Sequence, residues 1–204
     1  MQRDTLFRLA SMTKPVTSVA ALMLLDEGKI KLSDPVRKWI PELANRRVLR
    51  KADGPLDDTV PANRDITVED LLTHRSGLAL PGIITGPIAQ AYDDAIGWGI
   101  STPWTTDTWL AAVGKLPLVY QPGERMQYGI STNVLGFLIE RVDHKTLQAS
   151  LKDRIFAPLG MKDTDFWVPP AKMNRLASLY QFDEAKDVLT KASDFITGDI
   201  DKTP

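Results

Sequence analysis

Apolar residues are most concentrated between Leu9 and Gly28, where they fall on nearly every side of a helical projection. A helix without a polar face is expected to run through the interior of a protein. Proline is tolerated only in the first helical turn, so Pro15 requires the helix to begin within a few residues of it. Gly28 provides a stop, because glycine adopts positive φ readily. The pattern therefore predicts a central helix that begins beside Ser11. Its apolar residues are Val16, Val19, Ala20, Ala21, Leu22, Met23, Leu24 and Leu25.

Five shorter helices are predicted from apolar positions at helical spacing and from start and stop signals. They cover residues 35–40, 67–74, 106–115, 134–142 and 147–155. The first begins at Pro35 after a Ser-Asp cap, and the second begins with a threonine cap followed by acidic residues. Extended segments are expected at 4–8, 29–32 and 164–167, and the first two are too short to make a sheet. The pattern indicates a mostly helical chain.

Two stretches between these helices are predicted to be irregular. Residues 45–65 carry a basic run that acidic residues follow closely, which favours a solvated loop or hairpin over a binding patch. Residues 79–104 hold four glycines and three prolines and are expected to form a long loop with about one helical turn. Trp98 in that loop is either a pocket wall or an anchor of the loop to its own core. From Asp183 onward the chain is polar, and no closing element is predicted.

Composition excludes several classes of function. The 204 residues can bury a sizeable core, as one large domain or one and a half small ones. Lys and Arg number 25 against 26 Asp and Glu, so the net charge of −1 creates no overall field that attracts nucleic acid or acidic lipid. The absence of cysteine excludes disulfides and thiolate metal sites. No metal site or cofactor is predicted, and the longest apolar run is too short to span a bilayer.

The N-terminal residues carry no basic-then-apolar signal segment, although only ten residues precede Ser11 and the natural start is expected to lie upstream. The sequence therefore says little about the cellular location of the protein, with the cytoplasm slightly favoured. The chain has two histidines and no Gly-x-Ser-x-Gly sequence, which disfavours a Ser-His-Asp hydrolase of the α/β type.

Ser11 and Lys14 are three residues apart, so in a helical turn they share a face and the lysine can reach the hydroxyl. Serine becomes a nucleophile when a base takes its proton, and an amine accepts a proton only in the neutral form that burial or nearby positive charge favours. The positive end of a buried helix offers both conditions, and its N–H groups suit a developing oxyanion. The alternative is an N-cap serine followed by a solvated lysine. The position of the pair in the most apolar helix favours catalysis.

Tyr128 precedes the periodic helix over 134–142 and is expected at the turn into it, on the rim of a site. The alternative is a half-buried tyrosine whose hydroxyl has a backbone partner.

Four segments of the chain resemble the serine β-lactamase-like superfamily, in the order found there. The segments are LFRLASMTKPVTSVAALMLLDEGKIKLSDPV, ITVEDLLTHRSGL, PGERMQYGISTNVLGFLIERV and FAPLGMKDT, within residues 5–170. The superfamily includes class C β-lactamases, penicillin-binding D,D-peptidases, family VIII carboxylesterases and lovastatin-type acyltransferases. The resemblance implies that Ser11 is the acylated nucleophile, Lys14 its proton acceptor, and Tyr128 the general base and acid. It gives His74 a structural role, in which the imidazole satisfies carbonyls of the preceding helix turn.

Two departures from the superfamily pattern narrow the expected activity. β-Lactamases and D,D-peptidases of this group usually carry Tyr-x-Asn, whose amide contacts the substrate, whereas Ile130 stands two residues after Tyr128. The spacing from Tyr128 to Gly136 also resembles that of the esterases and acyltransferases. The resemblance therefore favours a family VIII-type carboxylesterase over a lactamase.

The resemblance implies an α+β multi-domain fold of the β-lactamase/transpeptidase type, of which this chain holds mainly the nucleophile helix and the helical domain. We expect residues 1–32 to belong to the α/β domain and residues 33–204 to a mostly helical domain with long loops. Most sheet strands, and the third site motif with its oxyanion donor, are expected outside this sequence.

The expected function is hydrolysis of short-chain carboxylic esters through an acyl-enzyme on Ser11. β-Lactam or amide cleavage and acyl transfer by the same groups remain alternatives, and a non-catalytic ligand-binding protein is an alternative of another class. The expected partner is a small-molecule ester, without nucleic acid or membrane, and the oligomeric state stays open.

Overall fold

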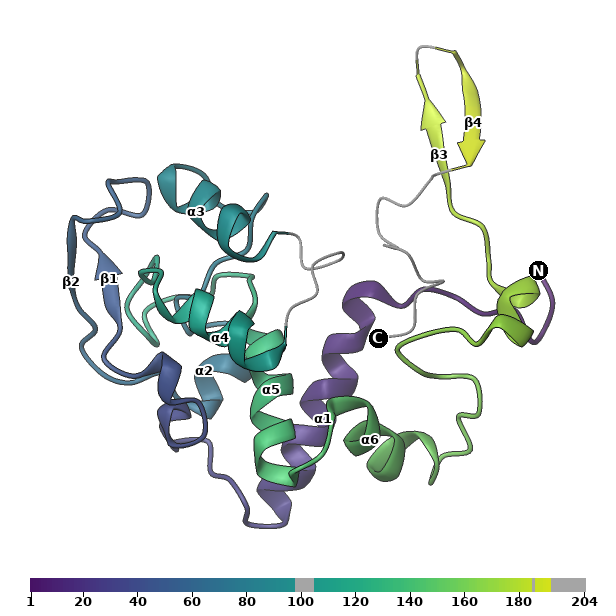
Figure 1. Cartoon of the computed structure of the whole chain (residues 1–204), viewed down its shortest axis with the longest axis horizontal. Helices are drawn as coiled ribbons and strands as arrows, with labels where there is room; N and C mark the ends of the chain where they lie inside the picture. Colours follow the sequence, from purple (N-terminus) through teal and green to yellow (C-terminus); the bar gives the residue numbers. More distant parts are fainter. Residues whose placement is uncertain (98–104, 185, 192–204) are drawn as a thin grey trace.

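A computed structural model describes residues 1–97, 105–184 and 186–191 of the chain, and Trp98 lies outside the described residues. Six α-helices and two small antiparallel hairpins are present in this part (Figure 1). The α-helices are α1 (Thr13–Asp26), α2 (Val68–Leu72), α3 (Pro87–Ile96), α4 (Thr106–Gly114), α5 (Ser131–Asp143) and α6 (Leu147–Leu151). The strands are β1 (Arg47–Leu49), β2 (Thr59–Pro61), β3 (Tyr180–Asp183) and β4 (Val188–Lys191). Short 3-10 helices cover Ala10–Met12, Val36–Lys38, Pro41–Leu43 and Pro170–Arg175, and a π-helix covers Lys152–Phe156.

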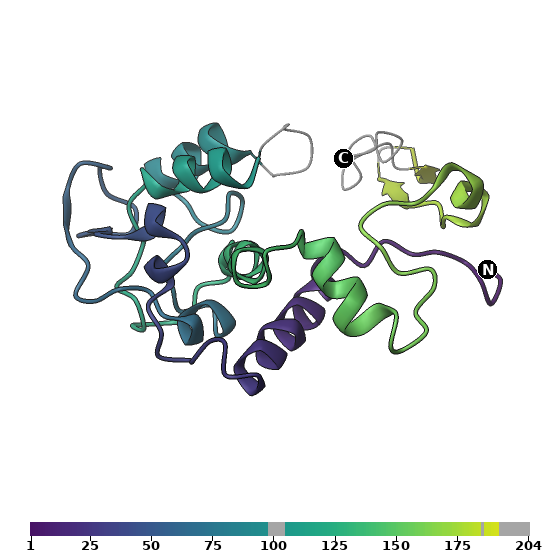
Figure 2. The same ribbon diagram turned by 60° about the horizontal axis from the view of Figure 1, so that its bottom comes forward.

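The core is built around α5, which packs against α1, α2 and α6. Seen nearly end-on in Figure 2, α5 lies between α1 and the pair α3 and α4. Its buried residues include Val134, Leu135, Leu138 and Ile139, which share one face at helical spacing. The predicted helix over 134–142 is therefore confirmed, and it starts three residues earlier.

Helix α1 begins and ends where the sequence predicts, with Gly28 at φ 72° just beyond its end. Among the described elements, α5 and α6 cover one side of α1. Val19 and Leu22, on the other side, are 47% and 45% exposed. The expectation of a helix enclosed on all sides is therefore wrong for the described chain, because no described element covers this second apolar face.

The segment after α1 differs from its prediction. Residues 29–32 form no strand: Lys29 is in a bend and Leu32 begins a turn, in which the N–H of Lys31 donates to the Asp34 carboxylate at 2.9 Å. Pro35 has an extended backbone (ψ 129°) and precedes a 3-10 helix instead of opening an α-helix. The N–H of Val36 is held by the carbonyl of Ile66 at 2.8 Å, and this long-range contact overrides the local helix signal.

The helices at 67–74 and 106–115 are confirmed as α2 and α4. Thr67 and Asp70 form a capping box at the start of α2, and Thr105 and Thr108 form one at the start of α4. The helix predicted at 147–155 is α6, which continues as the π-helix Lys152–Phe156.

The predicted long loop at 79–104 contains a helix of ten residues, α3, so that prediction is wrong. Pro87 stands in the first turn of α3, and Gly86 and Gly97 flank the helix. Proline and glycine at these places mark the ends of a helix rather than a loop. Ile88, Tyr92 and Ile96 are four residues apart and fully or almost fully buried, so this helix owes its position to packing.

Residues 45–65 form the hairpin β1–β2, as one of the two expected outcomes, with Val48 paired to Val60. Arg46 belongs to the core rather than to a surface patch, because its guanidinium donates to the carbonyls of Val113, Gly114 and Leu116. It thereby satisfies carbonyl groups at the C-terminal end of α4, which have no partner within the helix.

The C-terminal region also departs from expectation. Residues 164–167 form bends and no strand. The hairpin β3–β4, missed in a stretch that reads as polar, extends away from the helices (Figure 1). The first residues of the chain lie beside this region, since Leu6 forms a parallel bridge with Leu176. In the described ranges no helix is long and apolar enough to cross a membrane.

Candidate active site

Ser11 lies in the 3-10 turn Ala10–Met12, directly before α1. Ala10, the residue before it, has φ 45°, a left-handed conformation that alanine rarely adopts. Such backbone strain concentrates at functional sites, where the surrounding structure maintains it. The sequence pattern contained no sign of this conformation.

The hydroxyl of Ser11 contacts both other predicted site residues. Its Oγ lies 2.8 Å from the hydroxyl of Tyr128 and accepts a hydrogen bond from Lys14 Nζ at 3.1 Å. Lys14 Nζ also lies 4.8 Å from the centre of the Tyr128 ring. The expected reach of Lys14 to Ser11 is therefore present, and Tyr128 joins the pair from a position 117 residues away.

Tyr128 is half-buried at the turn that leads into α5. Its hydroxyl contacts Ser11 Oγ, which differs from the backbone partner that the structural alternative expects. Lys14, and then the hydrogen bond with Ser11, hold the pKa of the Tyr128 hydroxyl below its ordinary value. A positive charge and a donor both favour the phenolate, so the phenol is prepared to give up its proton.

The start of α1 is at the surface of the described chain. Ser11 is exposed, Lys14 is partly exposed and Met12 is 68% exposed. The expected burial of this helix end is therefore absent, because the described residues leave one side of the group uncovered. That open side leaves room for a substrate to reach Ser11 Oγ.

The turn that carries Tyr128 is pinned to the segment after α2. A Cβ at Gly129 would lie 2.5 Å from the carbonyl oxygen of Leu78, so only glycine fits at this close approach. The buried hydroxyls of Ser76 and Ser131 are hydrogen-bonded at 2.8 Å. These contacts hold the turn that carries Tyr128 close to the segment after α2.

The imidazole of His74 does not satisfy the carbonyls of α2, so that expectation is wrong. His74 has φ 54°, and its ring is stacked on Tyr128, with centroids 5.1 Å apart and planes inclined by 18°. Its Nε2 lies 3.4 Å from the Thr132 hydroxyl, and its Nδ1 has no hydrogen-bond partner among the described residues, so neither ring nitrogen contacts a carbonyl of α2. Sequence reasoning missed this neighbour because the two residues are far apart along the chain.

Ile130 is 2% exposed and its side chain belongs to the core. The expectation that its side chain stands where a substrate-contacting amide would be is therefore not met by the described arrangement. The sequence still has no Asn two residues after Tyr128.

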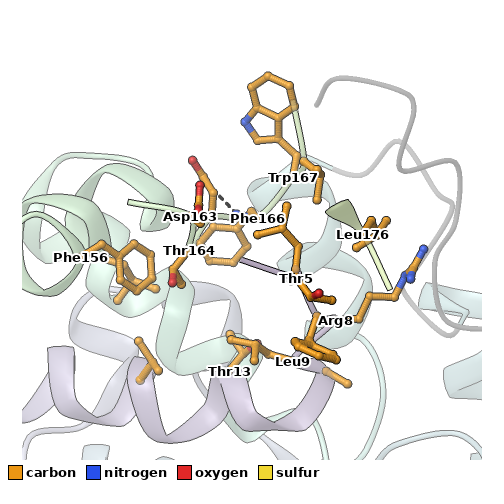
Figure 3. Close-up of a pocket in the computed structure, with 17 residues that line it drawn as sticks. Thr5, Arg8, Leu9, Thr13, Phe156, Asp163, Thr164, Phe166, Trp167 and Leu176 are labelled. Carbon is orange, nitrogen blue, oxygen red and sulfur yellow. Dashed lines mark hydrogen bonds between the residues drawn. The ribbon is translucent and has the colours of Figure 1, made fainter. Parts of the chain in front are cut away.

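A cavity of about 490 Å³ lies near the same helix end but does not include the three site residues. Figure 3 shows Thr13 lining it from α1 and Phe166 from the later segment. Thr13 and Val16, which both line it, project from another side of α1 than Ser11 and Lys14. The cavity is therefore separate from the place where the Ser11, Lys14 and Tyr128 side chains meet. Among the described residues, no three His, Asp or Glu side chains are grouped as metal ligands.

The α1–α5 arrangement, with Ser, Lys and Tyr side chains gathered at the start of α1, defines a protein of the β-lactamase-like fold class. This agrees with the fold class expected from the sequence. The Beta-lactamase family matches residues 1–195, and the chain belongs to this family.

Several curated proteins with different names are similar to this chain in sequence. Protein Rv1367c of Mycobacterium tuberculosis (strain ATCC 25618 / H37Rv) is 49% identical over 185 residues, which cover 90% of this chain and 45% of the relative. Esterase EstB of Burkholderia gladioli is 36% identical over 168 residues, covering 81% of this chain and 40% of the relative. The chain spans about half the length of the curated relatives it matches.

Solved structures agree with this membership. EstCE1, described as a hydrolase with promiscuous acyltransferase activity, superposes with a TM-score of 0.79 at 26% identity, over 95% of this chain and 47% of that one. Unliganded simvastatin synthase (LovD) from Aspergillus terreus gives a TM-score of 0.74 at 28% identity, over 97% and 49%.

Proposed function

We propose that this protein is a serine hydrolase that cleaves short-chain carboxylic esters through an acyl-enzyme on Ser11. The observation that carries the proposal is that Ser11 Oγ is within hydrogen-bonding reach of both Tyr128 OH, at 2.8 Å, and Lys14 Nζ, at 3.1 Å. A nucleophile with a base in contact and a second acid-base group beside it is the minimum that acyl transfer requires.

In the proposed mechanism, Lys14 accepts the proton of Ser11 while Oγ forms a bond to the ester carbonyl carbon. The tetrahedral intermediate collapses, the bond to the alcohol oxygen breaks, and Tyr128 gives that oxygen a proton. In the acyl-enzyme Lys14 keeps the serine proton and Tyr128 is a phenolate. Water then attacks the acyl carbon and gives a proton to the phenolate, the bond to Ser11 Oγ breaks, and Lys14 returns its proton to Oγ. The lowered pKa of Tyr128, due first to Lys14, supports its use as a base in the last step.

Acyl transfer is a second candidate, supported by the names of relatives. Monacolin J acid methylbutanoyltransferase of Aspergillus terreus is 32% identical over 167 residues, which cover 81% of this chain and 39% of the relative. An alcohol in place of water on the acyl-enzyme would yield a new ester by the same proton transfers. Adding an alcohol acceptor to the hydrolysis reaction separates the two: formation of the new ester supports transfer, and unchanged formation of acid supports hydrolysis.

The proposal is tested by intact-mass spectrometry of the protein after reaction with a fluorophosphonate. We expect one adduct on the parent and none on Ser11→Ala, with the parent's hydrolysis of nitrophenyl butyrate lost in the variant. Ser33→Ala, which changes another exposed serine, serves as the control and should react like the parent. An adduct that forms equally on Ser11→Ala would contradict the nucleophile assignment. A parent that neither reacts nor hydrolyses esters would favour a non-catalytic binding protein.

We also infer the domain division expected from the sequence, with residues 1–32 in an α/β domain and residues 33–204 in a mostly helical one. The apolar outer face of α1, with Val19 and Leu22 exposed, supports a further layer on that side. The bridge between Leu6 and Leu176 links the first segment to a late part of the second.

A further inference from the structure

His74 is a partly buried titratable residue beside the site that the proposed mechanism does not use. Its ring lies against the ring of Tyr128, with a centroid distance of 5.1 Å and an interplanar angle of 18°. This is an offset-stacked range for two aromatic side chains. One face of the phenol is therefore covered by an imidazole, while its hydroxyl reaches Ser11.

The segment that carries His74 is joined to the segment that carries Tyr128 on both sides of the stacked rings. The carbonyl of His74 accepts the N–H of Gln127 at 2.8 Å, one residue before Tyr128. His74 Nε2 lies 3.4 Å from the hydroxyl of Thr132, in the first turn of α5. The imidazole is thus held by backbone and side-chain contacts that flank the tyrosine in sequence.

The surroundings of His74 suit a neutral ring. Nδ1 is buried and has no hydrogen-bond partner among the described residues, so a second N–H there would lack an acceptor. Burial, and then the nearby charge of Lys14, lower the pKa of His74. A neutral imidazole can stack on the phenol without opposing the positive charge of Lys14.

His144 shows that the backbone conformation alone does not require this contact. It follows α5 with φ 54°, as His74 follows α2 with φ 54°, yet its side chain is exposed. Two histidines in the same left-handed position at helix ends therefore have different surroundings. Only the one at the site is covered by a partner ring.

We propose that His74 is a positioning residue for Tyr128, whose imidazole is the platform that holds the phenol hydroxyl against Ser11 Oγ. This inference rests on the proposed function, in which Tyr128 transfers protons. Loss of the platform would let the phenol rotate away from Ser11. Small displacements of a reacting group lower rates strongly, by on the order of 10²-fold for about 1 Å.

The test compares His74→Asn, which tolerates a left-handed backbone but removes the ring, with His74→Phe, which keeps a ring. We expect kcat for nitrophenyl butyrate to fall about 10- to 100-fold in His74→Asn with KM within about threefold, as for a misplaced proton-transfer group. His74→Phe should stay within about threefold of the parent. His144→Asn, the matched exposed histidine, should not change either constant.

A second readout does not depend on turnover. The ultraviolet titration of Tyr128, isolated by difference from Tyr128→Phe, should move toward the ordinary tyrosine range in His74→Asn, because the hydroxyl loses Ser11 and Lys14. It should remain near the parent's in His74→Phe.

Unchanged kcat and Tyr128 titration in His74→Asn would overturn the inference while leaving the proposed function intact. A His74→Phe variant as slow as His74→Asn would also overturn it, since a ring alone would not suffice. If Ser11→Ala and Tyr128→Phe were both fully active, the proposed function would fail, and the Tyr128 titration would still test the stacking. Should His74→Asn not fold, Thr132→Val takes its place. We expect a threefold to tenfold loss of kcat there, and no loss would count against the platform.

Discussion

Lys14 and Tyr128 contact the same oxygen atom of Ser11. Substitution of each residue can therefore distinguish an effect of its charge from an effect of proton transfer. In Lys14→Arg the positive charge is retained, but guanidinium stays protonated and cannot accept the serine proton. We expect acylation to slow by at least about 10²-fold, the lower end for a lost general base. The rate of the mass increase during reaction with nitrophenyl butyrate measures this step. If the arginine variant acylates within tenfold of the parent, Lys14 acts through its charge alone.

Tyr128→Phe removes the hydroxyl and keeps the stacked ring. We expect a loss of about 10² to 10⁴ in kcat/KM, the range for a positioned acid-base group. The pKa of Tyr128 is lowered by Lys14, so in the parent the phenolate forms at a lower pH than in free tyrosine. The rate of acyl-enzyme hydrolysis, in which Tyr128 is the base, should therefore rise with pH and level off below about pH 10, the ordinary tyrosine value. A pH–rate profile with the same alkaline limb in Tyr128→Phe would assign that limb to another group.

At the scale of secondary-structure elements, one arginine joins the ends of three helices. Arg154, in the π-helix after α6, donates to Asp143 at the end of α5 through Nε (2.7 Å) and Nη2 (2.6 Å). It also pairs with Glu27, which follows α1. The side chain of Asp143 is 6% exposed, so this is a nearly buried, bidentate ion pair.

Arg154→Met should leave the nearly buried Asp143 carboxylate without its bidentate partner, with Lys29 Nζ at 3.5 Å as a remaining charged contact. Breaking a buried pair in this way costs about 3 kcal/mol of unfolding free energy, measured as a lower urea midpoint at pH 7. Lys29→Met is the control, because Lys29 is 46% exposed and solvent screens its contacts with the same carboxylates, so the urea midpoint should change little. A smaller effect in Arg154→Met than in Lys29→Met would show that this junction is not stabilised by the arginine.

The ion pairs of Arg154 also predict that the stability of the fold depends on pH. Arg154, then Lys29, lower the pKa of Glu27 to about 2, and Arg154 also lowers the pKa of Asp143. Carboxylates with a lowered folded-state pKa stabilise the fold above their unfolded-state pKa, near 4. This stabilisation is lost as the pH falls from about 4 toward 2. The parent should therefore lose more of its urea midpoint between pH 5 and pH 3 than Arg154→Met, and equal losses would argue against the linkage.

For the whole molecule, the expected preference is for esters over β-lactams. A site without an amide at the Tyr-x-Asn position leaves the acylamino group of a β-lactam substrate with one hydrogen bond fewer, at a cost of roughly 1 to 3 kcal/mol. We expect kcat/KM for nitrophenyl butyrate to exceed that for a chromogenic cephalosporin by at least about tenfold. A parent that opens the cephalosporin as efficiently as it cleaves the ester would rank the lactamase alternative first.

Ile130→Asn would not restore lactam recognition, because the side chain at 130 lies in the core. The buried amide should instead lower the unfolding free energy by about 2 kcal/mol or more, from lost apolar burial and unpaired polar atoms. The urea midpoint measures this effect. A stable variant with improved cephalosporin hydrolysis would mean that residue 130 faces the substrate in the active protein.

The sequence by itself determined the features that depend on neighbours along the chain. The bounds of α1, the capping boxes of α2 and α4, and the reach of Lys14 to Ser11 follow from helical spacing and end signals within a few residues. The four motif segments indicated the fold class, and their resemblance to the superfamily predicted that Tyr128 belongs to the site. Tertiary structure alone decided the stacking of His74 on Tyr128, the burial of Ile130 and the helix α3. These depend on contacts between segments far apart in the chain, and packing energy there outweighs local preferences that differ by less than about 1 kcal/mol.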